Sequence, residues 1–136
     1  MEQTPVESKK SRILLVEDDL LLVKMYQTKF TMEGFELLVA SDGEAGLQIA
    51  QRENIDFLIL DIMLPKLSGI DVLEKLKRDP NKKDIPVLIL TNLTQEEEAK
   101  KALALGAKEY LIKSDITPKD LIDKVRKYLP QTSSTS

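Results

Sequence analysis

Short, continuous apolar runs alternate with longer amphipathic segments along this chain. A continuous apolar run is typical of a strand that is buried on both faces of a parallel sheet. The runs place strands near 12–16, 35–40, 56–60, 85–90 and 109–112. Because these strands alternate with helical segments, the pattern predicts an α/β fold with a doubly wound parallel sheet.

Local signals mark where helices begin and end. The first helix is expected over about 20–33 and stops before Gly34, a residue suited to the position after a helix end. Its predicted buried face consists of Leu22, Met25, Tyr26 and Phe30. Ser-x-x-Glu and Thr-x-x-Glu patterns that begin at Ser41 and Thr94 predict capping boxes for the second and fourth helices.

The remaining helices differ in the size of the side chains that they can bury. The third is expected over about 67–78, with Ile70, Leu73 and Leu76 inside. The fifth opens with Thr117-Pro118 and offers Leu121, Ile122, Val125 and Leu129. The buried face of the fourth helix, which ends at Gly106, would consist mainly of Ala99, Ala102 and Leu103. Burying one large side chain stabilises by about 1.5–3 kcal/mol, so the fourth helix is predicted to be the most weakly held. Alternatively, its small residues simply permit close packing.

Composition narrows the possible functions. At 136 residues the chain is expected to form one domain over 11–130, with disordered tails at 1–10 and 131–136. The absence of cysteine excludes disulfides, thiolate catalysis and the usual structural zinc sites. The absence of histidine excludes imidazole base catalysis and a role as a phosphohistidine donor. The charges form no basic stripe and no run could span a bilayer, so we expect a cytoplasmic protein that binds neither nucleic acid nor membrane.

Carboxylates follow two of the apolar runs. Glu17, Asp18 and Asp19 come after the first predicted strand, and Asp61 follows the third. Strand ends of an open parallel sheet meet at its carboxyl edge, where such folds hold their ligands. Acids that converge there repel one another unless a cation lies between them. The sequence therefore predicts a magnesium-type pocket with one carboxylate free to act as a nucleophile.

These residue types suit phosphoryl transfer. Asp61 could attack a phosphoryl group, while Thr91 and Lys113, which end two other apolar runs, could bind the remaining phosphoryl oxygens. Asp19 is a plausible cap for the first helix. Two of the three acids after the first strand are expected to lie in the pocket with Asp61. They are either Glu17 and Asp18, which we favour, or Asp18 and Asp19.

Four motifs together resemble the receiver domain of two-component response regulators, over about residues 11–130. They are Ile13-Leu14-Leu15-Val16-Glu17-Asp18-Asp19, Asp61-Ile62-Met63-Leu64-Pro65 with Gly69, then Thr91, and Tyr110-Leu111-Ile112-Lys113. The resemblance implies a flavodoxin-like fold with strand order 2-1-3-4-5. It also implies that Asp61 is the phosphoacceptor. The same resemblance implies that Glu17, Asp18, Asp61 and the backbone carbonyl of Met63 bind Mg²⁺ or Mn²⁺.

The resemblance also implies a switch and its partners. Thr91 would be the switch hydroxyl, Tyr110 the switch aromatic and Lys113 the lysine that pairs with the phosphoryl oxygens. A histidine kinase or phosphotransfer protein would supply the phosphoryl group to this stand-alone regulator, which would be no enzyme beyond its own phosphorylation and dephosphorylation. The fourth helix, fifth strand and fifth helix would then bind a downstream protein, and a homodimer stays open.

The chain departs from the family pattern at two positions. Asn92 stands where a small residue is usual, and it could narrow access to the pocket. Ser114 stands where proline is common, which affects the loop at Lys113. One alternative is therefore a receiver-like interaction module that works without phosphorylation. A phosphatase of the haloacid-dehalogenase type would need an aspartate at Met63, and a flavin site would need a phosphate-binding loop where the acids stand.

Overall fold

The computed structural model describes residues 10–129. The tails predicted at 1–10 and 131–136 lie outside these residues, apart from Lys10. The limits of the predicted domain therefore stay a prediction. Within residues 10–129, no helix is long and apolar enough to cross a bilayer.

One parallel sheet of five strands forms the centre of the molecule. The strands are β1 (Arg12–Val16), β2 (Glu36–Ala40), β3 (Phe57–Leu60), β4 (Val87–Thr91) and β5 (Glu109–Ile112). Their order is β2-β1-β3-β4-β5. This confirms the predicted flavodoxin-like topology. The register pairs Val16 with Ala40 on one side and with Leu60 on the other, so β1, β2 and β3 end level with one another.

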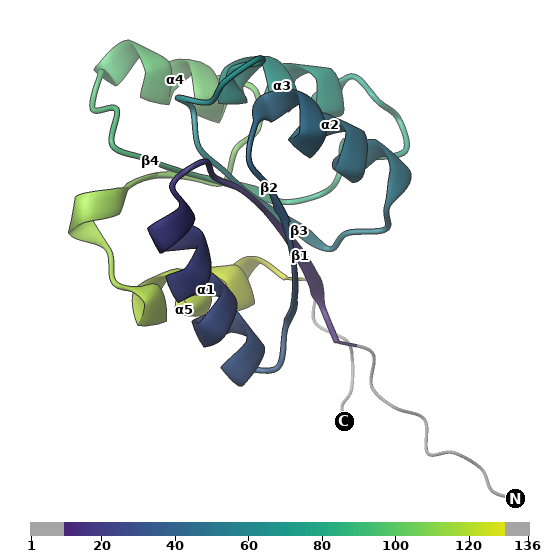
Figure 1. Cartoon of the computed structure of the whole chain (residues 1–136). Coiled ribbons are helices and arrows are strands. Elements are labelled where there is room, and N and C mark those ends of the chain that lie inside the picture. The colour runs from purple at the N-terminus through teal and green to yellow at the C-terminus, as the bar shows by residue number, and fades with distance from the viewer. Residues whose placement is uncertain (1–9, 130–136) are drawn as a thin grey trace, which may run out of the picture.

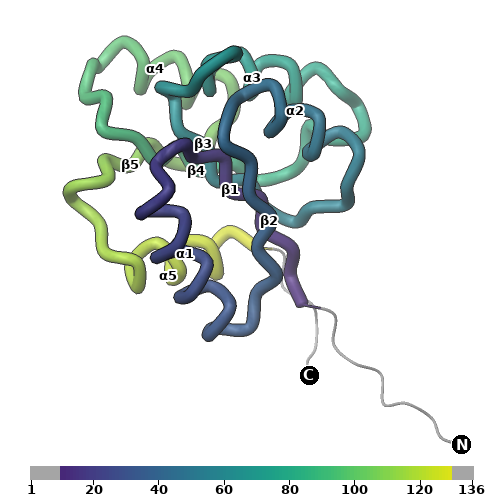
Figure 2. Tube along the Cα trace, viewed as in Figure 1, coloured from purple at the N-terminus to yellow at the C-terminus, as the bar shows by residue number. Residues whose placement is uncertain are grey.

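Helices cover both faces of the sheet. They are α1 (Leu20–Met32), α2 (Gly43–Arg52), α3 (Gly69–Lys77), α4 (Glu96–Ala104) and α5 (Pro118–Tyr128), with a short 3₁₀ turn at Lys113–Asp115. In Figure 1, α1 and α5 lie below the sheet, and α2, α3 and α4 lie above it. Figure 2 shows the same layers along the Cα trace, with the strands between the two groups of helices.

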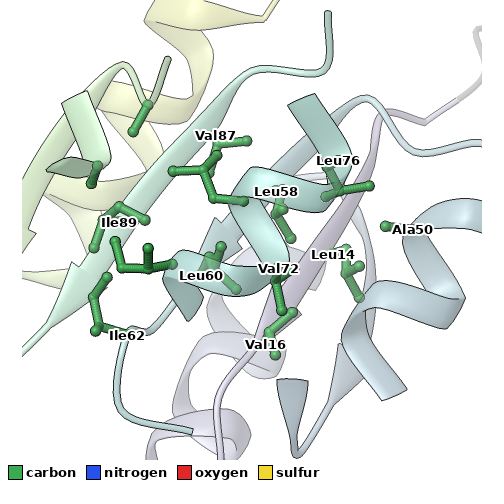
Figure 3. Packing of buried hydrophobic residues seen from close by; sticks show 14 of the residues in the cluster. Leu14, Val16, Ala50, Leu58, Leu60, Ile62, Val72, Leu76, Val87 and Ile89 are labelled. Carbon is green, nitrogen blue, oxygen red and sulfur yellow. The ribbon is translucent and has the colours of Figure 1, made fainter. Parts of the chain in front are cut away.

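Each face of the sheet contributes to its own apolar core. Leu14 and Val16 of β1 pack in the core on the side of α2 and α3, which Figure 3 shows from close by. Ile13 and Leu15 pack in the other core, on the side of α1 and α5. Successive side chains of a strand point to opposite faces, so a strand between two cores is apolar at every position. This is why the strands appear in the sequence as continuous apolar runs.

One of the three predicted helix caps is correct, and α5 begins at Pro118 as predicted. Asp19 caps α1 by accepting hydrogen bonds from the amides of Leu21 and Leu22. Thr117 and Asp120 form a capping box at the start of α5.

The two capping boxes predicted from Ser41 and Thr94 are wrong. Asp42 caps α2 instead, since its Oδ1 accepts from the amide of Ala45 at 2.7 Å. The N-cap position of α4 is Gln95, one residue after the predicted cap Thr94, and no side-chain hydrogen bond forms there. In both cases the helix starts one residue later than the local pattern predicts.

Two predicted core residues lie at the surface. Met25 is 40% exposed, and α1 buries Val23 beside Tyr26 and Phe30 instead. Leu103 is 46% exposed, and Ala102 is the buried residue of α4. Each helix is therefore rotated about its axis, relative to the sheet, from the orientation that the pattern suggested. Leu129, predicted inside, is half-buried.

Glu109 at the start of β5 ties the sheet edge to α5. The Tyr128 hydroxyl and, at 2.9 Å, the Lys124 ammonium donate hydrogen bonds to its carboxylate, and these contacts hold the pKa of Glu109 below its usual 4.5. A carboxyl whose folded-state pKa is lowered stabilises the fold above its unfolded-state pKa, and the stabilisation is lost as the pH falls through the folded-state value.

Replacing Glu109 with glutamine is therefore expected to lower the free energy of unfolding by about 1 kcal/mol at pH 7. The difference from wild type should shrink as the pH falls below 4.5, because the wild-type carboxylate then becomes protonated. Urea denaturation at several pH values measures both effects. Glu74→Gln, which removes an exposed ion pair with Arg78, is the control. It should lower the free energy of unfolding by less than Glu109→Gln does. A difference that stays constant down to pH 3 would contradict the prediction.

Candidate functional site

Three acidic side chains meet at the carboxyl edge of the sheet. Glu17 and Asp18 follow β1, and Asp61 follows β3. The sheet hydrogen bonds continue one residue beyond these strands, from the Glu17 amide to the Ala40 carbonyl at 3.0 Å and from the Asp61 amide to the Val16 carbonyl at 3.2 Å. One carboxylate oxygen from each of the three acids lies within 4.8 Å of the others. Glu17 and Asp61 are buried, whereas Asp18 is exposed.

Asp19 is excluded from this cluster by its role in α1. Its Oδ1 accepts from the amides of Leu21 at 3.0 Å and Leu22 at 3.4 Å. Its own amide donates to Glu17 Oε2 at 3.0 Å, which anchors one oxygen of the Glu17 carboxylate. Glu17 and Asp18, the pair that we favoured, are thus the two acids of this loop that lie near Asp61.

Lys113 connects two of the three acids. Its Nζ lies 2.7 Å from Asp61 Oδ2 and 2.7 Å from Glu17 Oε1, and its side chain is 12% exposed. Burial alone would lower the pKa of Lys113, but the hydrogen bonds and charges of Asp61 and Glu17 outweigh burial and raise it. Burial also raises the pKa of Glu17 above its usual 4.5, despite the hydrogen bonds from Lys113 and the Asp19 amide.

The loop after Asp61 folds back onto it. The Met63 amide donates to Asp61 Oδ1 at 3.2 Å, so both oxygens of Asp61 have a donor. At the other end of the loop, the Gly69 amide donates to the Ile62 carbonyl at 2.9 Å. A Cβ atom at Gly69 would lie only 2.0 Å from the Asp61 carbonyl oxygen. Gly69 belongs to the motif around Asp61, but the sequence gives no sign of this close contact, which brings the start of α3 against the backbone of Asp61.

Thr91 and Tyr110 lie farther along the same edge and share one neighbour. Thr91 ends β4 and is fully buried, and its Oγ1 accepts from the Leu93 amide at 3.2 Å. The Tyr110 hydroxyl donates to the Leu93 carbonyl at 2.7 Å. Within residues 10–129, neither side chain forms a hydrogen bond with Asp61 or Lys113. The backbone of Leu93 joins the two predicted switch residues, a link that sequence reasoning missed because it uses no side chain of Leu93.

The two residues that depart from the family pattern, Asn92 and Ser114, form no unusual backbone structure. Asn92 is exposed and directly follows Thr91. Ser114 lies within the 3₁₀ turn Lys113–Asp115, and no peptide bond in the part of the chain that the structure describes is cis. Neither residue contacts Asp61 by a hydrogen bond or an ion pair.

The donor atoms suit a small, hard divalent cation. Glu17, Asp18 and Asp61 supply carboxylate oxygens, the ligands that Mg²⁺ and Mn²⁺ prefer. Among residues 10–129, three carboxylates lie at this edge with one paired ammonium group, that of Lys113, so negative charge is left uncompensated there. A bound cation would neutralise it. The residues present therefore fit such an ion.

Comparisons with known proteins agree with this geometry. Residues 13–126 match the family model of the response regulator receiver domain. The chain is 35% identical over 129 residues to the probable transcriptional regulator ycf27 of Cyanophora paradoxa, an alignment that covers 95% of this chain and 52% of the relative. It is 34% identical over 119 residues to the response regulator SaeR of Staphylococcus aureus, covering 88% and 50%. The chain thus spans about half the length of these curated relatives.

Solved structures give the same result. A CheY-like receiver domain protein of Methanospirillum hungatei superimposes with a TM-score of 0.82 at 27% identity, covering 88% of this chain and 93% of that one. A chain of the CheX–CheY–BeF₃–Mg²⁺ complex of Borrelia burgdorferi superimposes with a TM-score of 0.78 at 30% identity, covering 86% and 87%. The chain therefore belongs to the response regulator receiver domain family.

Proposed function

We propose that this chain is a phosphoacceptor in a two-component phosphorelay, and that Asp61 receives the phosphoryl group. The observation that carries the proposal is the convergence of Glu17, Asp18 and Asp61 within 4.8 Å, with the Lys113 ammonium 2.7 Å from Asp61. This arrangement combines a nucleophilic carboxylate, a set of oxygen ligands and a fixed positive charge. Those are the groups that transfer of a phosphoryl group requires.

The chemistry is a direct displacement at phosphorus. A carboxylate oxygen of Asp61 forms a bond to phosphorus, while the bond from phosphorus to the nitrogen of the donor's phosphohistidine breaks and its electron pair stays on that nitrogen. Lys113, already paired with Asp61, remains beside the phosphoryl oxygens and offsets their charge. A Mg²⁺ or Mn²⁺ ion held by Glu17, Asp18, Asp61 and the Met63 carbonyl would supply further positive charge to those oxygens.

The resulting signal would leave through another protein. Phosphorylation replaces the carboxylate of Asp61 with a larger, more highly charged group, which favours movement of the Thr91 hydroxyl toward it. Such a movement would remove the acceptor of the Leu93 amide, and the Leu93 carbonyl holds Tyr110. The change would thus reach the surface formed by α4, β5 and α5. The Borrelia burgdorferi complex, in which CheY is bound to CheX with BeF₃ and Mg²⁺, supports a protein partner for this chain.

Intact mass spectrometry tests the proposal. Wild type incubated with Mg²⁺ and acetyl phosphate or phosphoramidate should gain the mass of one phosphoryl group. Asp61→Asn should gain nothing, and neither should wild type in the presence of a chelator. Asp19→Asn is the matched control, because asparagine caps a helix as well as aspartate does and Asp19 lies outside the acidic cluster. This variant should gain the same mass as wild type.

Failure with small donors is not by itself decisive, because a kinase could still be required. No mass gain with small donors and none with any candidate histidine kinase or phosphotransfer protein would contradict the proposal. The chain would then be a phosphorylation-independent interaction module of the receiver family. A gain that persists in Asp61→Asn would instead place the phosphoryl group on another residue.

Asn92→Ala is expected to increase the rate of phosphorylation by small donors about three- to tenfold, or roughly 1 kcal/mol in the barrier. Asn92 is exposed beside Thr91, and a smaller side chain would widen access to Asp61. The measurement is the initial rate of mass gain at a fixed phosphoramidate concentration. Asn81→Ala, in the loop before β4, is the control and should leave the rate unchanged. Equal rates for Asn92→Ala and wild type would show that Asn92 does not restrict the pocket.

A further inference from the structure

The start of α2 lies directly against the loop that follows Asp61. The Gly43 amide donates a hydrogen bond to the Pro65 carbonyl at 3.1 Å. A Cβ atom at Gly43 would lie 1.7 Å from the Leu67 carbonyl oxygen and 2.6 Å from its carbonyl carbon. Both are backbone atoms, so no side-chain rotation could relieve the clash. Any residue other than glycine at position 43 would therefore displace either α2 or the loop.

The loop has little freedom to absorb such a displacement. It runs from Ile62 to Ser68, and the hydrogen bond from the Gly69 amide to the Ile62 carbonyl closes it. Inside it, the Leu67 amide donates to the Pro65 carbonyl at 2.8 Å. Lys66 has a φ of 71°, a left-handed conformation that is unfavourable for a residue with a side chain. The hydrogen bonds within and across the loop hold it in this conformation. A displacement of Leu67 would therefore also displace the other residues of the loop, including Met63.

The loop begins at the reacting carboxylate. The Met63 amide donates to Asp61 Oδ1 at 3.2 Å, and the proposed function assigns the Met63 carbonyl to the divalent cation. A shift of the loop would therefore move a donor of Asp61 and one cation ligand together. Gly43 forms its hydrogen bond with Pro65, and the atoms nearest to its ideal Cβ all belong to Leu67, so any effect on Asp61 would act through the loop.

We infer that Gly43 is a positioning residue of the Asp61 site, which sets divalent-cation affinity by letting α2 hold the loop that carries Met63. The inference rests on the proposed function, because it concerns the cation that this function requires. It assigns α2, which contributes no side chain to the acidic cluster, a part in the chemistry of the site. A glycine in the first turn of a helix is the sequence signal for it, because glycine is unfavourable there unless space or backbone conformation requires it.

Calorimetric titration with MgCl₂ of wild type, Gly43→Ala and Gly34→Ala tests the inference. Gly34 has a φ of 92° and no atom within 4 Å of its ideal Cβ, so alanine there strains the backbone without touching the loop. Gly43→Ala should weaken Mg²⁺ binding about tenfold, equivalent to 1.4 kcal/mol. Gly34→Ala should stay within about twofold of wild type. The amide resonance of Met63 in a ¹H–¹⁵N spectrum should shift in Gly43→Ala alone.

Folding of each variant is monitored by far-ultraviolet circular dichroism in the same buffer. If Gly43→Ala does not fold, all three proteins are titrated in about 1 M trimethylamine N-oxide, an osmolyte that favours the folded state. Folded Gly43→Ala with wild-type Mg²⁺ affinity would overturn the inference and leave the proposed function standing. Equal weakening in Gly43→Ala and Gly34→Ala would also overturn it, since general destabilisation would then explain both. A wild-type chain that binds no Mg²⁺ would overturn the inference and the proposed function together.

Discussion

Lys113→Met is expected to lower the free energy of unfolding by about 3–5 kcal/mol at pH 7 without divalent cations. The ammonium lies 2.7 Å from both Asp61 and Glu17, which are 5% and 1% exposed at the side chain. Removing it leaves two buried carboxylates without their counter-charge. Methionine has a similar length and fills the space, so the loss reports on charge rather than on packing.

Magnesium should partly reverse this loss. A divalent cation beside the same carboxylates would replace the missing positive charge, and a ligand that binds only the folded state stabilises it. We therefore expect Lys113→Met to bind Mg²⁺ about tenfold more tightly than wild type, and its urea midpoint to rise more on addition of MgCl₂. Urea denaturation with and without MgCl₂, combined with calorimetric titration, measures both effects.

The stability that Lys113→Met loses relative to wild type should also depend on pH, and it should increase as the pH rises. Burial already raises the pKa of Glu17 above 4.5, and removing Lys113 takes away a contact that lowers it. A carboxyl with a raised folded-state pKa contributes stability below its unfolded-state pKa of 4.5, and this stability is lost as the pH rises through the folded-state value. The difference between Lys113→Met and wild type should therefore grow as the pH increases above 4.5.

Lys124→Met is the matched control for this experiment. Lys124 pairs with Glu109 at 2.9 Å, but its side chain is 33% exposed. A partly exposed pair contributes about 1 kcal/mol or less, so this variant should lose little stability and should not respond to Mg²⁺ differently from wild type. Equal losses in the two variants, or no change in the Mg²⁺ response of Lys113→Met, would contradict the expected coupling between Lys113 and the cation site.

Gly69→Ala is expected to lower the free energy of unfolding by about 2–3 kcal/mol and to reduce phosphorylation of Asp61 strongly. Its Cβ would lie 2.0 Å from the Asp61 carbonyl oxygen and 2.8 Å from the Ile62 Cα atom. Relief requires the start of α3 to move away from the phosphoacceptor's backbone, which also weakens the hydrogen bond from Gly69 to Ile62. Thermal or urea unfolding gives the stability, and intact mass after reaction with phosphoramidate gives the activity.

Ser68→Ala serves as the control at the neighbouring position. Its hydroxyl caps α3 by accepting from the Asp71 amide, and loss of a cap costs about 1 kcal/mol without a steric clash. Ser68→Ala should therefore be moderately destabilised and still become phosphorylated. Wild-type stability and phosphorylation in Gly69→Ala would mean that the start of α3 can move freely, contrary to the close contact in the structure.

The amino-acid sequence by itself determined where the strands lie and which residues stand at their carboxyl ends. Leu14 and Leu15 point into different cores, and this burial on both faces produces the continuous apolar run that marked β1. Once the runs are recognised as parallel strands, Glu17 and Asp61 must reach the same edge of the sheet. The end of α1 before Gly34 was equally visible, because the left-handed conformation there favours glycine.

Only the tertiary structure decided how helices sit against the sheet. The apolar residues of α1 span more than one face, and packing selects Val23 and leaves Met25 exposed. Neighbouring residues can each cap a helix, so the local pattern could not choose between Ser41 and Asp42.

The contacts of the site also depend on distances between segments that are far apart in the chain. Lys113 reaches Glu17 as well as Asp61, and Gly43 touches the backbone of Leu67. A local sequence pattern reports the period and polarity of one segment, but it carries no information on how closely two segments approach. Sequence therefore identified the acids that meet at the edge of the sheet. The tertiary structure decided how the Asp61 carboxylate is held, by the Lys113 ammonium from the end of β5 and by the Met63 amide.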